Sequence, residues 1–195
     1  MATNNIEIEA KVLLSQENYQ KVLAVFPFQG EPTVQTNYYL DSNDRILKKY
    51  GMILRIRHVG DTYTLTMKAP LAEGLLEKNQ VLSDAEFDHF FHENIFPQGE
   101  VFDFLDVLHI KPSNLHILAH LTTERKEAPY KDTMVDISKN TYSGKVDYEL
   151  ECDSDSVSKS EKTLEDVCAK LGIPFVLNTL SKETRAINAA TDHKE

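Results

Sequence analysis

Ionisable side chains recur at every second position in several short segments of this chain. The acidic segments lie near the two ends and contain Glu7 and Glu9, then Asp147, Glu149 and Glu151. The basic segments lie between them and contain Arg55 and Arg57, then Lys68. Lys11 follows the first acidic pair at the same spacing. Residues two apart share a face of a β-strand, so each segment predicts a strand with one charged face.

Carboxylates and guanidinium groups on one surface suit two kinds of ligand. Carboxylate oxygens, together with water, are typical ligands of hard divalent cations such as Mg²⁺ and Mn²⁺. Arginine forks and lysine ammonium groups bind phosphate oxygens. Such a set is costly when it is empty, because ionised groups lose water. The combination therefore indicates a polyanion held with divalent cations, and a triphosphate fits the charge balance.

The strands that must position these side chains follow from the alternation of polar and apolar residues. Eight segments show it, the third and fourth joined by a turn at Gly60 and Asp61. They are Ile6 to Leu14, Thr33 to Asp41, Met52 to Val59, Tyr63 to Ala69, Gly74 to Leu82, Leu115 to Glu127, Thr133 to Ser138 and Lys145 to Cys152.

Helical patterns lie between and after the strands. Ser15 is a candidate N-cap for a helix through Val25, and Ser83 with Glu86 forms a capping-box pattern. A short helix is expected from Gly99 to Leu108, and another is expected to begin at Ser160 and end at Gly172. Short strands with helices inserted predict an α+β fold on an antiparallel sheet, as one domain over residues 1–195.

The charged strand faces have two interpretations. The simpler one is a half-buried sheet with its charged face in water. Against it, acids concentrate on the first and last strands and bases on the middle ones, whereas a solvated face normally mixes the signs. Amphipathic helices also need an apolar sheet surface to cover. If they cover the outside of a closed eight-stranded barrel, the charged faces line its interior, and this tunnel is the fold we predict.

Composition limits the class of protein. The 195 residues are 41% hydrophobic, enough for a core, and the apolar stretches are shorter than the roughly 20 residues of a membrane span. The net charge of −10 argues against binding to nucleic acid or membranes. No signal peptide is visible, and two cysteines are too few for a disulfide framework. We therefore expect a cytoplasmic protein, with its oligomeric state open.

Several ordered motifs resemble the CYTH, or triphosphate tunnel, family, which includes thiamine triphosphatases, inorganic triphosphatases and class IV adenylate cyclases. Glu7-Ile8-Glu9-Ala10-Lys11 resembles the family's ExExK signature, and Leu54-Arg55-Ile56-Arg57 resembles its LRxR strand. The other similar segments follow in the family's order: Asn37 to Asp41, Thr64 to Lys68, Glu124 to Lys126, Val135-Asp136, Tyr148 to Glu151 and Ser181-Lys182.

The resemblance implies a role for each matching position. The implied metal ligands are Glu7, Glu9, Asp136, Glu149 and Glu151, with Mg²⁺ or Mn²⁺ as the cofactor. The implied phosphate-binding residues are Lys11, Arg55, Arg57, Lys68, Arg125 and Lys182. Lys11 either contacts the scissile region or balances the charge of the first two glutamates. Glu77 lies where relatives often carry a glutamate, although Leu75 replaces an arginine in the same strand.

Other candidate sites are weaker. His89, His92 and Glu93 fit exposed helix positions better than a metal site, and nothing marks His116 and His120 as ligands. Gly144-Lys145 lacks the rest of a phosphate-binding loop, and Ser156 to Lys159 matches a serine nucleophile motif only in a Ser-rich linker.

The leading functional prediction is metal-dependent hydrolysis of an inorganic or small organic triphosphate. The catalytic set is Glu7, Glu9, Lys11, Glu149 and Glu151. One alternative is cyclisation of ATP to cyclic AMP, although Met1 and Ala2 occupy the positions where class IV cyclases often carry a His-Phe pair. The other alternative is a non-catalytic module that binds polyphosphate or a nucleotide.

Overall fold

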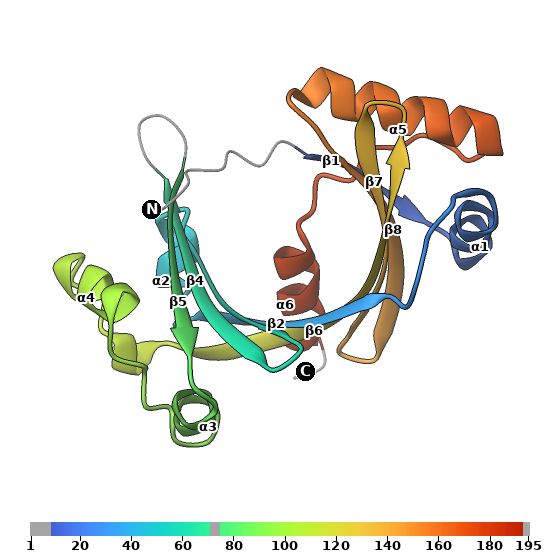
Figure 1. The fold of residues 1–195 in the computed structure, drawn as a ribbon. Helices are drawn as coiled ribbons and strands as arrows, with labels where there is room; N and C mark the ends of the chain where they lie inside the picture. The colour runs from blue at the N-terminus through green and yellow to red at the C-terminus, as the bar shows by residue number, and fades with distance from the viewer. Residues whose placement is uncertain (1–8, 71–74, 193–195) are drawn as a thin grey trace.

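Eight antiparallel strands form one curved sheet in the computed structural model, which describes residues 9–70 and 75–192 (Figure 1). The strand order is β1-β8-β7-β6-β2-β3-β4-β5. The strands are β1 (Glu9–Leu14), β2 (Thr33–Asp41), β3 (Ile53–Val59), β4 (Thr62–Pro70), β5 (Leu75–Leu82), β6 (His116–Tyr130), β7 (Thr133–Tyr142) and β8 (Lys145–Asp153). Each predicted strand has its counterpart, so the prediction of an antiparallel α+β fold is confirmed.

The prediction of a closed barrel is wrong for the described part of the chain. Strands β1 and β5 are the two edges of the sheet, and no pairing joins them there. Closure requires a hydrogen-bonded ladder between the first and last strands of the order. The sheet instead curves into an open trough, and the residues of α6 pack on its concave side (Figure 1). The alternation identified the two faces correctly, but it carries no information about whether the edges meet.

Strands β6 and β7 extend further than expected. The predicted sixth strand ended at Glu127, yet Pro129 still pairs with Met134 beside a hairpin turn at Lys131, where φ is 54°. The β7–β8 hairpin turns at Ser143 and Gly144, both with positive φ, which is the geometry of a tight two-residue hairpin turn. These extensions matter because they lengthen the polar faces of both strands.

The helices begin where capping chemistry permits. Ser15 caps α1 (Gln16–Val25) and Ser83 forms the predicted capping box of α3 (Asp84–Glu93), followed by α4 (Glu100–Val107). The predicted start of α5 (Val157–Leu171) was wrong, because Ser156 is its N-cap. Ser160 is buried inside that helix, so the Ser-rich segment is a helix start rather than a linker. The remaining short elements are α2 (Ile46–Lys49), a 3₁₀ turn (Pro112–Asn114) and α6 (Lys182–Asp192).

Two apolar clusters cover the convex side of the sheet and a smaller one covers the concave side. Helices α3 and α4 pack on β3, β4 and β5, and helices α1 and α5 pack on β1, β7 and β8. On the concave side Ala186, Ile187 and Ala189 of α6 pack against Tyr39, Ala119 and Leu121. One helix therefore shares the concave face with the charged side chains. Within the described residues, no helix is both long and apolar enough to cross a membrane.

Candidate functional site

Strand register brings the predicted charged residues onto one face. Glu9 lies opposite Asp153, and Lys11 lies opposite Glu151, in the β1–β8 pair. On the other half of the sheet, Arg55 lies opposite Tyr39, whose ring packs with the concave residues of α6. Because side chains alternate between faces, the charged residues lie on the concave side, opposite the buried apolar rows.

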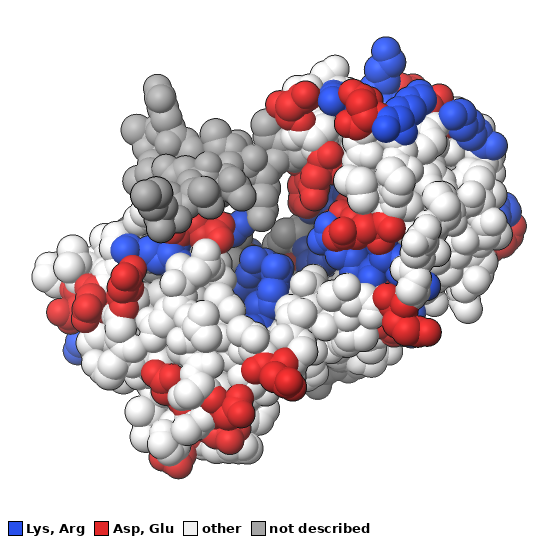
Figure 2. Space-filling model, in the orientation of Figure 1, with Lys and Arg blue, Asp and Glu red and all other residues white. Residues whose placement is uncertain are grey.

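A cavity of about 250 Å³ opens on this concave face, and basic side chains gather in the hollow (Figure 2). Its lining is Glu9, Lys11, Gln35, Asn37, Tyr39, Ile53, Arg55, Arg57, Lys68, Arg125, Glu151, Asp153, Ser181, Lys182 and Glu183. Six of these residues are basic and four are acidic, so the lining carries a net charge of +2 in a chain whose net charge is −10. The lining is therefore more basic than the chain as a whole, a balance that favours anionic ligands.

The structure places most of the predicted site residues in or next to this cavity. All six predicted phosphate-binding residues line the cavity, as do Glu9 and Glu151. Asp136 and Glu149 lie in the adjoining polar layer, where they are 2% and 0% exposed. Glu7 lies outside the described residues. Glu77 lies opposite Lys68 on β5, and their side chains form an ion pair of 3.3 Å.

Strands β3 and β4, with β2, form the basic wall of the cavity. Arg57 donates from Nε to Oδ1 of Asn37 at 3.0 Å, which aims its guanidinium along the concave face. Within residues 9–70 and 75–192, the buried Nε of Arg55 has no hydrogen-bond partner. A buried donor without an acceptor costs about 1–3 kcal/mol, so this group is an expected contact of a bound anion.

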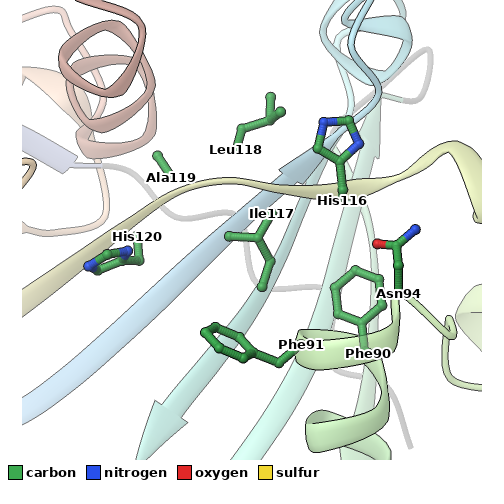
Figure 3. Close-up of a pocket in the computed structure, with 8 residues that line it drawn as sticks. All are labelled: Phe90, Phe91, Asn94, His116, Ile117, Leu118, Ala119 and His120. Atoms are coloured by element: carbon green, nitrogen blue, oxygen red, sulfur yellow. The ribbon is translucent and has the colours of Figure 1, made fainter. Parts of the chain in front are cut away.

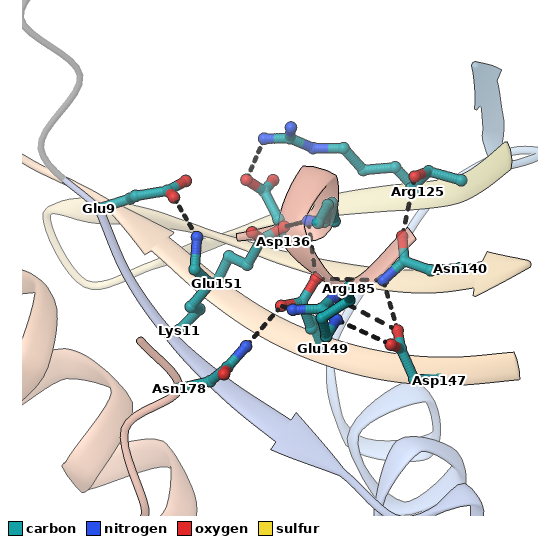
Figure 4. Close-up of polar contacts among 12 residues, drawn as sticks. Glu9, Lys11, Arg125, Asp136, Asn140, Asp147, Glu149, Glu151, Asn178 and Arg185 are labelled. Carbon is teal, nitrogen blue, oxygen red and sulfur yellow. Dashed lines mark hydrogen bonds and ion pairs between the residues drawn. The ribbon is translucent and has the colours of Figure 1, made fainter. Parts of the chain in front are cut away.

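Strands β1, β8 and β7 form the acidic wall, and its carboxylates are heavily bonded (Figure 4). Glu149 accepts from four side chains: Asn140 at 3.1 Å, Asn178 at 3.2 Å, and Arg185 and Lys182 each at 2.9 Å. A carboxylate has about four lone-pair sites, so these contacts use them all. Burial opposes ionisation, but Lys182 and Arg185 outweigh it and lower the pKa of Glu149 to about 2.

Lys182 links two acidic residues of β8. Its Nζ lies 2.9 Å from Oε2 of Glu149 and 2.6 Å from Oε2 of Glu151. Burial raises the pKa of Glu151, and the charge of Lys182 only partly offsets the effect. The two carboxylates raise the pKa of Lys182 in spite of its burial. The ammonium group is therefore charged and fixed at the point where the acidic strand meets the cavity.

Arg125 and Asp136 form a second pair across β6 and β7. A guanidinium nitrogen of Arg125 donates to Oδ2 of Asp136, and Arg125 also lies near Glu127 and Asp153. Burial raises the pKa of Asp136 to about 6, and Arg125 counteracts only part of that effect. Ionisation of Asp136 therefore costs more free energy in the folded protein than in water.

The acidic wall has the right atoms for a hard divalent cation. Glu9 faces Asp153 and Asp136 faces Glu151 across adjacent strands, and like charges in such positions repel unless a cation lies nearby. Among residues 9–70 and 75–192, no three His, Cys, Asp or Glu side chains are already gathered as a metal site. Lys11 instead pairs with Glu9 at 2.5 Å. The donor chemistry fits Mg²⁺ or Mn²⁺, and basic side chains occupy the donors in this conformation.

Sequence reasoning missed several residues of the site. Asp153 lies one residue beyond the predicted end of β8, although the period of two continues to it. Glu183 and Arg185 belong to α6, and Glu183 lines the cavity. Arg185 lies three residues after Lys182, so helical spacing would have placed both on one side of a helix.

His116 and His120 lie on a different surface from the charged cavity. A pocket of about 390 Å³ between α3 and β6 is lined mainly by apolar residues, with Asn94, His116 and His120 (Figure 3). The ring of His120 lies 6.2 Å from that of Tyr38, and Tyr38 packs against the residues on the convex side. None of the described residues that line this pocket is a carboxylate, and none of them lines the charged cavity.

Comparison with known proteins connects the cavity to a family. The model of the CYTH domain matches residues 5–187. YjbK of Bacillus subtilis, provisionally named a triphosphatase, is 29% identical over 173 residues, which cover 88% of this chain and 90% of YjbK. The similarity therefore includes all of the strands that form the cavity.

Solved structures show the same fold. A Bacillus halodurans protein, bh2851, provisionally named an adenylate cyclase, is 34% identical with a TM-score of 0.76, covering 93% of this chain and 97% of that protein. HpAC1 of Hippeastrum, provisionally named an adenylyl cyclase and described as having a dominant triphosphatase activity, is 19% identical with a TM-score of 0.75. That match covers 94% of this chain and 95% of HpAC1, and it supports the fold alone.

Proposed function

This chain belongs to the CYTH domain family, and we propose that it is a metal-dependent triphosphatase acting on inorganic triphosphate or a small organic triphosphate. The names of its relatives indicate two different activities, because YjbK is provisionally named a triphosphatase and bh2851 is provisionally named an adenylate cyclase. The residues of the cavity therefore carry the argument.

The observation that supports triphosphate binding is the convergence of six basic side chains on one cavity beside two predicted metal ligands. The basic residues are Lys11, Arg55, Arg57, Lys68, Arg125 and Lys182, and the acidic ones are Glu9 and Glu151. A monophosphate would leave most of these bases without an anionic partner. A chain of three phosphates offers oxygens to both walls at once, which matches a basic and an acidic wall facing one cavity.

Three ion pairs on the acidic wall can exchange partners when a ligand binds. Lys11 pairs with Glu9, Arg125 with Asp136, and Lys182 with Glu151. Each pair joins a proposed phosphate ligand to a proposed metal ligand. When a triphosphate enters, these three bases gain phosphate oxygens as alternative acceptors, and the carboxylates they leave become available as oxygen donors.

The roles of the chain's own groups follow from this arrangement. Arg55, Arg57 and Lys68 hold the phosphate chain and stabilise the negative charge that develops on the transferred phosphoryl group. The proposed ligands of a divalent cation are the predicted ones, Glu7, Glu9, Asp136, Glu149 and Glu151. The cation would neutralise phosphate charge and activate the attacking water. Lys182 and Lys11 orient the phosphate oxygens nearest the carboxylates.

Phosphate release from the purified full chain tests the proposal directly. Tripolyphosphate, thiamine triphosphate and ATP are each assayed with Mg²⁺, Mn²⁺ and Co²⁺. We expect metal-dependent turnover of at least one substrate, and a fall of about 100-fold in the variants Glu9→Gln and Glu151→Gln. The matched control is Glu165→Gln, the same substitution at an exposed position of α5. Unchanged turnover in both cavity variants would exclude this mechanism.

Product analysis separates the other two functions. Cyclic AMP and pyrophosphate from ATP would indicate a cyclase, whereas ADP and phosphate would indicate hydrolysis. Tight binding of tripolyphosphate in calorimetry, with no turnover under any metal, would indicate a binding module.

A further inference from the structure

Arg185 is a buried base that the proposed reaction does not use. Its side chain is 9% exposed, and its Nε lies 2.9 Å from Oδ2 of Asp147. Its Nη1 donates to Oε1 of Glu149 at 2.9 Å and to the carbonyl oxygen of Leu180 at 2.9 Å. One guanidinium group therefore joins β8 to the segment that leads into α6.

The acceptor that holds Arg185 is itself fixed. Asp147 also accepts from the hydroxyl of Tyr142 at 2.6 Å and from Nδ2 of Asn140 at 2.9 Å. Asn140 in turn accepts from Thr123 of β6 at 2.8 Å, so the contacts extend across three strands. Such a connected polar network is rigid because each member restricts the orientation of the next.

Arg185 and Lys182 act on the same carboxylate. They are three residues apart in the first turn of α6, which places them on one side of the helix. Both contact Glu149, Arg185 through Oε1 and Lys182 through Oε2. The first turn is thereby held at two points on β8, and the Nζ of Lys182 lies 2.6 Å from Oε2 of Glu151 at the cavity.

We propose that Arg185 is a positioning residue of the triphosphate site. Its contacts with Asp147 and Glu149, which we call the mount, fix the first turn of α6. Lys182 is thereby placed where it contacts both the phosphate and Glu151. This inference rests on the proposed function. It also reassigns Glu149, whose carboxylate serves the mount rather than the metal because four donors already occupy it. Glu9 and Glu151 then remain as the described β1 and β8 metal ligands.

A role in stability alone explains the cluster poorly. Helix α6 already packs through Ala186, Ile187 and Ala189 on the concave face. Burying several charges costs desolvation, and apolar groups of similar volume often give equal or greater stability. What the ionic cluster adds is direction, because a guanidinium fork between two carboxylates fixes both the position and the rotation of the helix end.

The test compares Arg185→Lys and Arg185→Met with Ile187→Val, which trims the apolar packing of the same helix. The first readout is independent of turnover: acetylation of Lys182 by acetic anhydride, measured site by site with mass spectrometry on the metal-free full chain. We expect the reactivity of Lys182 to rise at least threefold in both Arg185 variants and to stay at the wild-type level in Ile187→Val. Arg185→Lys keeps the positive charge, so Lys182 can still be measured in that variant if Arg185→Met does not fold.

The second readout is the kinetics of tripolyphosphate hydrolysis, well below the melting temperature. Loss of positioning should lower kcat by about ten- to a hundredfold in Arg185→Lys, with a smaller change in KM and no change in Ile187→Val. Equal reactivity of Lys182 in wild type and both Arg185 variants would overturn the proposal, as would an equal loss of kcat in Ile187→Val. If the wild type itself releases no phosphate, the proposed function fails, and the acetylation result still decides whether Arg185 positions Lys182.

Discussion

The two walls of the cavity differ in how their charges are satisfied within the protein. On the basic wall, Arg57 is oriented by Asn37, and the buried Nε of Arg55 has no hydrogen-bond partner in the part of the chain that the structure describes. On the acidic wall, Glu149 has four donors and Glu151 is paired with Lys182. The basic wall therefore offers an open contact to an incoming anion, whereas the acidic wall is neutralised by the protein's own cations.

The two walls should therefore respond differently when a ligand binds. An unpartnered buried donor gains a hydrogen bond when an anion binds, so under the proposed function the basic wall is preorganised for phosphate. A paired carboxylate must exchange its ammonium or guanidinium partner before it can hold another cation. Substitutions on the basic wall should therefore affect function more than folding, whereas substitutions in the buried mount of the acidic wall should affect both.

The largest expected effect is on the basic wall. Arg55→Met removes a fork directed at the cavity, and we expect kcat/KM for tripolyphosphate to fall by about 100- to 1,000-fold, or roughly 3–4 kcal/mol. Urea unfolding should show a stability equal to or above that of the wild type, because a buried donor without a partner is lost. Lys21→Met, which removes an exposed base on α1, is the control and should leave both quantities unchanged. A large loss of stability in Arg55→Met would erase the distinction between the walls.

The second effect concerns the mount. The pKa of Glu149 is lowered from 4.5 to about 2, so its contribution to stability is present above pH 4.5 and is lost as the pH falls toward 2. Glu149→Gln should therefore lower the free energy of unfolding at pH 7 by about 3 kcal/mol and the Tm by roughly 6–12 °C. Differential scanning calorimetry measures both. The metal concentration for half-maximal turnover should shift less than in Glu151→Gln, and the opposite order would return Glu149 to the metal ligands.

Asp136 on the same wall should behave in the opposite way. Burial raises its pKa from 3.8 to about 6, so the unfolded chain releases a proton that the folded protein retains between these values. Its contribution therefore falls as the pH rises from about 4 to 6, by about 2 kcal/mol. Asp136→Asn should flatten this part of the stability curve in urea titrations and raise stability at pH 7. A variant that is less stable than the wild type at pH 7 would show that the pair with Arg125 outweighs the cost of burial.

The smallest expected effect comes from Glu183. Burial raises the pKa of this carboxyl group, and its ionised form places a negative charge in the cavity beside Arg55. Glu183→Gln should tighten tripolyphosphate binding about three- to tenfold, or roughly 1 kcal/mol, in metal-free calorimetry. Glu165→Gln is again the control. Weaker binding in Glu183→Gln would mean that the carboxyl group contacts the ligand favourably.

Local patterns in the sequence predicted the strands and most of the helix ends. Ser15 and the Ser83–Glu86 box marked two helices correctly, because a cap depends only on its own few residues. Ser160 was wrong as a helix start because four serines lie in that segment, and the structure buries Ser160 and leaves Ser156 as the cap. Arg185 was not recognised because its partners on β8 lie 36 and 38 residues away.

The sequence by itself determined which side chains share a face, since the period of two is a property of an extended chain and needs no partner. It therefore determined that Glu9, Arg55 and Glu151 avoid the apolar core. Only the tertiary structure decided that β2 pairs with β6, that the edges β1 and β5 stay apart, and that α6 lies on the concave face. Those outcomes depend on packing and charge pairing between segments that are far apart in the sequence. A local sequence pattern therefore does not predict them.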